Sequence, residues 1–92
     1  MGVVMKGAER DAFYDELVCA VSDGELTWGE AVRELRVKVA GLDQATFARV
    51  TKISVRTLRH LEHGTGNPTL STLRAVLTPF GIELTMQRVR RG

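Results

Sequence analysis

The fold is decided by the stretch "GLDQATFARVTKISVRTLRHLEHG", residues 41–64. Apolar residues recur at helical spacing in two of its segments, 44–51 and 55–62, which predicts two short helices. Residues 51–54, between these segments, leave room only for a tight turn. The side chains expected to face inward are Phe47 and Ala48 in the first helix and Leu58 and Leu61 in the second. Two helices joined by such a turn form the helix-turn-helix arrangement.

The second predicted helix keeps basic residues on its outer side. Helical spacing places Val55, Arg56, Arg59 and His60 away from the buried leucines. A solvated surface is the ordinary explanation for exposed arginines, whereas a helix that reads DNA presents such residues to base edges. Because these residues lie within a whole helix-turn-helix pattern, we favour the DNA-reading interpretation.

Three further helices are predicted around this pair. Helical spacing covers 8–22 and 28–40, and a last helix follows Thr69 and ends or bends at Pro79, which lacks a backbone N–H. Four of the five helix starts carry a residue that can accept from the amides of the first turn. These N-caps are Thr27, which forms a capping box with Glu30, and Asp43, Ser54 and Thr69.

The end of the chain has a different pattern. Residues 82–89, "IELTMQRV", alternate apolar and polar side chains, which predicts a β-strand. A single strand needs a partner for its backbone groups, and this chain offers only residues 3–5 as a second strand. We favour the same strand of a second copy, since chain starts are often disordered. The expected dimer contacts are Ile82, Leu84 and Met86.

Composition bounds the class of protein. Ninety-two residues suit one domain, and a single cysteine excludes an intrachain disulfide and a cysteine-rich metal site. Apolar runs are too short for a membrane span or a signal peptide, so we expect a cytoplasmic protein. Residues 1–30 hold two basic against seven acidic side chains, and residues 31–92 hold eleven basic against four acidic ones. The basic part is suited to a polyanion such as DNA, and the acidic part should lie away from it.

The stretch 41–64 closely resembles the XRE, or Cro/C1-repressor-type, helix-turn-helix family. The residues that carry the resemblance are Gln44, Ala48, Ile53, Leu58, Glu62 and Gly64. The resemblance continues through "NPTLSTLRAVL", 67–77, and the following "FGIELTMQRV", 80–89, is most similar to the HipB antitoxins of HipA-type kinases. One departure is Lys52, which stands where the family usually has glycine and would need a left-handed backbone conformation.

The resemblance implies a fold and a set of DNA contacts. The fold is an all-α, five-helix lambda-repressor-like domain over 27–81, with an extra acidic helical extension over 1–26 and a dimerisation strand and tail over 82–92. Its base-reading residues would be Val55, Arg56, Arg59 and His60. Its phosphate-binding residues would be Gln44, Thr57, His63, Thr65 and Asn67. Two copies would read half-sites about one helical turn apart.

Three functions remain open at this point. The first is a repressor that is also the antitoxin of a HipA-like kinase, the second is a free-standing XRE-type regulator, and the third is a protein-interaction module without specific DNA binding. No arrangement of an activated nucleophile and base suggests an enzyme, and no cofactor or metal is expected. We further expect Trp28 to pack in the core or the dimer and Cys19 to pack as a small apolar residue. Arg36 is either a phosphate contact or a surface residue.

Overall fold

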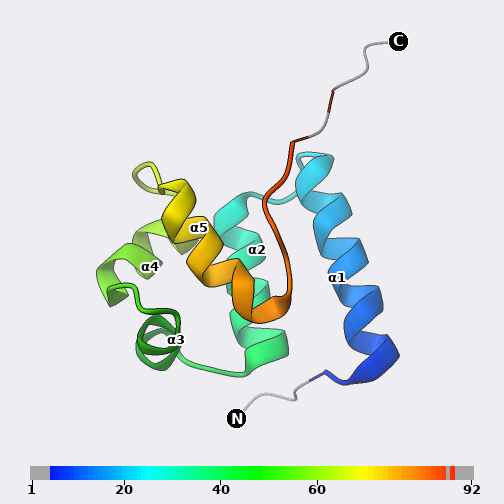
Figure 1. Ribbon diagram of the computed structural model, residues 1–92, viewed down its shortest axis with the longest axis horizontal. Coiled ribbons are helices and arrows are strands. Elements are labelled where there is room, and N and C mark those ends of the chain that lie inside the picture. The colour runs from blue at the N-terminus through cyan, green and yellow to red at the C-terminus, as the bar shows by residue number, and fades with distance from the viewer. Residues whose placement is uncertain (1–4, 87, 89–92) are drawn as a thin grey trace.

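The computed structural model describes residues 5–86 and residue 88 as a bundle of helices (Figure 1). The α-helices are α1 (Gly7–Ser22), α2 (Trp28–Glu34), α3 (Gln44–Thr51), α4 (Val55–His63) and α5 (Leu70–Leu77). Helix α2 continues as a π-helical segment, η1 (Leu35–Ala40), and α5 continues as a 3-10 turn, η2 (Thr78–Phe80). The all-α class is therefore confirmed. The helix count is corrected, because α1 is one of five α-helices in the described residues and not an addition to five.

The helix starts lie at the predicted caps. The Thr27 hydroxyl accepts from the Glu30 amide at 3.1 Å, and the Glu30 carboxylate accepts from the Thr27 amide at 2.9 Å, which completes the capping box. The other three caps each accept from the amide three residues later: Asp43 at 2.8 Å, Ser54 at 3.0 Å and Thr69 at 3.0 Å. Local sequence chemistry thus fixes where α2, α3, α4 and α5 begin.

The core lies where these four helices meet. The largest fully buried side chains are Val32, Leu35, Phe47, Leu58 and Val76. The rings of Phe47 and Phe80 stack with their centroids 6.0 Å apart, which ties α3 to the turn after α5. Helix α1 contributes Leu17 as its one fully buried side chain among the described residues, so it covers the core from one side.

Helices α2 and α4 cross at Gly29. A β-carbon on Gly29 would overlap the carbonyl oxygen of Leu61, so only glycine permits this approach of the two backbones. Because Leu61 lies on the buried face of α4, this crossing sets how far α4 stands from the core. Sequence reasoning missed Gly29, although a glycine inside a predicted helix often marks a close contact.

The turn between α3 and α4 has the predicted strain. Lys52 adopts a left-handed conformation with φ 62°, the single non-glycine residue in the described chain with a positive φ. The preceding Thr51 is buried, and its hydroxyl donates to the carbonyl of Phe47 at 2.7 Å, so its polar atom is satisfied. The amide of Ile53 then donates to the carbonyl of Ala48 at 3.0 Å and closes the turn.

The segment after α5 differs from the expected strand. Residues 82–86 have no strand partner within the described chain, and residues 87 and 89 of that prediction lie outside the described residues. Ile82 and Leu84 pack against the core of their own chain, whereas Met86 is 95% exposed. The alternation of inward and outward side chains is therefore present, but a lone extended segment has no second strand to bond with.

Two smaller expectations are corrected, one of them only in part. Cys19 is exposed on α1 and does not pack as a small apolar residue. Trp28 is 46% exposed at the start of α2, so the core half of its prediction is wrong, and packing in a dimer stays a prediction. In the described part of the chain, no helix is long and apolar enough to cross a membrane.

Candidate DNA-binding site

Helix α4 separates a buried face from an exposed basic face. Leu58 and Leu61 are buried, while Arg56, Arg59 and His60 are exposed, as the sequence predicts. Val55 is half-buried and packs against the core, so only part of its side chain is accessible for a base. The exposed face therefore has two guanidinium groups and one imidazole, all of which can donate hydrogen bonds to base edges.

A buried polar network holds α4 against its neighbours. The guanidinium of Arg36, on η1, donates to both carboxylate oxygens of Glu62, on α4, at 2.7 and 3.0 Å. The two side chains are 10% and 3% exposed. A third donor, the side-chain amide nitrogen of Gln44 at the start of α3, donates to the same carboxylate at 3.0 Å. Arg36 also donates to the carbonyl of Leu42 at 2.9 Å, so every polar atom of the group has a partner.

This network settles the open interpretation of Arg36. It is neither a phosphate contact nor a surface residue, because it is 8% exposed and bonded to Glu62. The periodicity of 28–40 gave no sign of this, since the partner lies 26 residues away in the sequence. Bidentate pairing of a planar guanidinium with a carboxylate fixes orientation as well as distance. Arg36 therefore positions α4 from its buried side, through Glu62.

The network reaches the exposed face through Gln44. Its side-chain oxygen accepts from the guanidinium of Arg59 at 3.4 Å, while its nitrogen donates to Glu62. Gln44 was predicted to bind phosphate, and the structure uses its side chain to connect Glu62 with Arg59. Its backbone amide belongs to the first turn of α3, where N–H groups have no partner within the helix.

The loop after α4 forms a small hollow beside the basic face. The hollow is about 270 Å³ and brings together four of the predicted DNA contacts: Thr57, His60, Thr65 and Asn67. Gly64 and Gly66 have φ of 73° and 74°, so the chain reverses at positions that favour glycine. The Thr65 amide donates to the carbonyl of His60 at 2.9 Å, which fixes the loop to the end of α4. His63 is exposed at that end but does not line the hollow.

The charges are arranged so that the basic face stays free. In the described part of the chain there are two ion pairs, Arg36 with Glu62 and Lys38 with Glu34, so Arg56 and Arg59 have no acidic partner there. Figure 1 shows the acidic helix α1 on the side of the molecule away from α3 and α4. The acidic groups of α1 therefore do not screen the basic face of α4. His60 and His63 belong to no group of three metal-ligating side chains among the described residues.

The fold and this face define a helix-turn-helix protein. The sequence model of the helix-turn-helix family HTH_3 matches residues 32–86, which is more than half of the chain. The chain therefore belongs to this XRE-type helix-turn-helix family, whose members are DNA-binding transcriptional regulators. No curated protein and no solved structure matches the chain.

Proposed function

We propose that the protein is a sequence-specific transcriptional repressor that places α4 in the major groove of its operator. The observation that carries this proposal is the one exposed face of α4. Arg56, Arg59 and His60 have no acidic partner in the described chain, and the opposite face is fixed by Leu58, Leu61 and the Arg36–Glu62 pair. A helix held this firmly presents its donors in one geometry, which is what base discrimination requires.

The side chains of α4 would divide the work of base reading. Arg56 is free to donate bidentately to a guanine, which is worth about 1–3 kcal/mol of discrimination. Arg59 is oriented by Gln44 and would read a neighbouring base, with His60 beside it. Val55 would contribute at most a thymine methyl contact through its accessible part.

The phosphate contacts would come from both sides of α4. Thr57 and the loop residues Thr65 and Asn67 surround one hollow, which suits a phosphate oxygen. His63, exposed at the end of α4, would contact the phosphates of the same DNA strand. Gln44 would contribute through its backbone amide at the start of α3, because its side chain is bonded to Glu62 and Arg59. These contacts set the position of the protein on DNA and carry no sequence information.

We also propose that two copies act together and that residues 82–86 join them. Beyond the Ile82 amide, which donates to Leu77 at 3.3 Å, the backbone of this segment has no backbone partner in the described chain. Antiparallel pairing with a second copy would satisfy these groups and cover Met86. A two-fold dimer would read a palindromic operator.

The resemblance of residues 80–89 to HipB antitoxins supports a finer proposal, namely that the repressor also neutralises a HipA-like kinase. The alternative is a regulator without a toxin partner. Copurification separates them: a kinase encoded beside this gene should copurify with the protein if the finer proposal holds. Absence of binding would favour the alternative, a regulator without a toxin partner.

The DNA proposal is tested by fluorescence anisotropy with duplexes from upstream of the gene and a shuffled duplex at two salt concentrations. We expect a preference of about a thousandfold for the operator. Arg56→Ala should lower operator affinity about five- to hundredfold and change shuffled-duplex affinity much less. Arg10→Ala, which removes an exposed arginine from α1 on the far side, is the control. Equal binding to both duplexes that disappears with salt would favour the protein-interaction alternative.

A further inference from the structure

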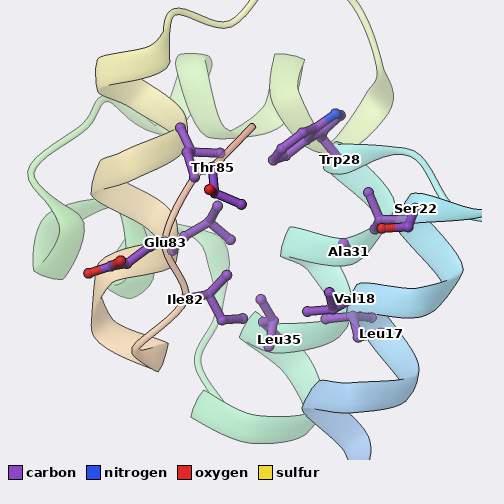
Figure 2. Close-up of a pocket in the computed structure, with 12 residues that line it drawn as sticks. Leu17, Val18, Ser22, Trp28, Ala31, Leu35, Ile82, Glu83 and Thr85 are labelled. Atoms are coloured by element: carbon purple, nitrogen blue, oxygen red, sulfur yellow. The ribbon is translucent and has the colours of Figure 1, made fainter. Parts of the chain in front are cut away.

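An apolar groove of about 320 Å³ runs between α1, α2 and the segment 82–85 (Figure 2). Trp28 and Ala31 of α2 and Leu35 of η1 form its floor, Val18 lies on the α1 wall, and Ile82 and Leu84 form the other wall. Figure 2 shows the Glu83 side chain directed away from it. The groove therefore takes its apolar character from consecutive helical elements and from a segment near the end of the chain.

The groove is incompletely covered in the single chain. Val18 is 49% exposed and Trp28 is 46% exposed, although both are large apolar side chains beside the core. The neighbouring Met86 is 95% exposed and follows directly on the segment that forms one wall. Apolar surface left open beside an unpaired backbone edge is typical of an interface with another chain.

We propose that the occupant of this groove is the Met86 side chain of a second copy. The proposal rests on the dimer proposed above. Ile82 and Leu84 pack against the core, and because side chains alternate along an extended segment we expect Met86 on the same face. If two such segments pair antiparallel about an axis at Leu84, position 86 of one lies directly opposite position 82 of the other. Each copy thereby places its uncovered Met86 beside the Ile82 wall of its partner.

The distribution of charge supports the same antiparallel arrangement of the two copies. In Figure 1, α1 and the segment 82–86 run the same way, so an antiparallel second copy has its residue 88 on the side of the start of α1. Helical spacing puts Asp11 and Asp15 in line with Val18 on the groove side of α1, and both are exposed. The chain that follows Met86 carries arginines at 88, 90 and 91. Arg88 is exposed, so such a pairing brings at least one positive charge toward these two carboxylates.

This inference gives α1 a role that the DNA-reading function does not require. Helix α1 forms one wall of the groove through Val18 and lies on the side away from α4. The dimer contact and the DNA contact consequently occupy different sides of the chain, and a change in one need not alter the other.

The test uses Trp28, the sole tryptophan of the chain, as a reporter of groove filling. Light scattering and Trp28 emission are recorded on the full chain from low to high concentration. We expect dimer formation and a blue shift of emission with the same midpoint, because filling the groove removes water from the indole. Met86→Asp should weaken dimerisation about tenfold or more and keep the emission of the monomer. Since Met86 is exposed in the single chain, this variant should fold normally.

The matched control is Leu70→Asp, which changes an apolar residue 68% exposed at the start of α5 and outside the groove. This variant should dimerise as tightly as the unmodified protein and show the same blue shift of Trp28 emission. A dimer that leaves Trp28 emission unchanged, or a Met86→Asp variant that dimerises as tightly as the unmodified protein, overturns the groove contact and leaves the dimer standing. A chain that stays monomeric at every concentration overturns the dimer itself, while DNA binding through Arg56 is measured separately.

Discussion

Replacing Glu62 with alanine should destabilise the protein strongly, because it leaves the buried guanidinium of Arg36 without its charge partner. Two short bonds, at 2.7 and 3.0 Å, would be lost, and the carbonyl of Leu42 would remain as the acceptor for Arg36. Breaking a buried pair in this way costs about 3–5 kcal/mol. A domain of this size has about 5–15 kcal/mol of stability, so the variant should retain only part of it.

The assay is urea unfolding followed by far-ultraviolet circular dichroism. With an m-value of about 1.5 kcal/mol/M, the midpoint should fall by about 2–3 M. Lys38→Ala, which breaks the exposed pair with Glu34, is the contrast and should cost less than about 0.5 kcal/mol. Arg36→Met combined with Glu62→Leu should recover most of the loss, since no charge is then buried alone. A Glu62→Ala midpoint within about 0.5 M of the unmodified protein would refute this reasoning.

Three further perturbations test the local arguments. Gly29→Ala should lower the free energy of unfolding by about 2 kcal/mol or more because of the overlap with the Leu61 carbonyl; a gain, as helix propensity alone predicts, would contradict the crossing. Lys52→Gly should raise that free energy by about 0.5–1 kcal/mol by relieving the left-handed strain, and urea unfolding that shows a loss would contradict it. The Thr46 amide, by donating to Asp43, lowers the pKa of that carboxyl. The stabilisation that the ionised Asp43 carboxyl gives to α3 is present above its usual pKa of 3.8 and is lost as the pH falls through its lower pKa in the folded protein. Hydrogen exchange of the Thr46 amide should therefore accelerate only as the pH falls through that lower pKa. The Asp43→Asn variant should show no such acceleration.

Much of the helix-turn-helix could be predicted because its determinants are local. A capping residue acts on an amide three positions away, and the inward faces of α3 and α4 follow from spacing within each helix. The left-handed Lys52 was predicted from the resemblance, because it stands where the family usually has glycine. These features depend on fewer than ten consecutive residues.

The features that sequence reasoning missed depend on contacts between distant residues. A periodic pattern assigns a charged residue to the surface, so it could not show that Arg36 is buried against Glu62. Gly29 was missed because its partner, the Leu61 carbonyl, lies on another helix. The extended segment 82–86 has the side-chain alternation of a strand, but the hydrogen bonds that make a strand require a second segment.

The base-reading residues themselves stay a prediction. The structure indicates at which of them a loss of DNA affinity can be separated from a loss of stability. Arg56 and His60 are exposed and take no part in the core, so their replacement should change stability by less than about 0.5 kcal/mol. Arg59 differs because its guanidinium is bonded to Gln44, which is bonded to Glu62. A loss of DNA affinity in an Arg59 variant therefore mixes a lost base contact with a disturbed network. Arg56 is the position where operator recognition can be measured separately from the fold.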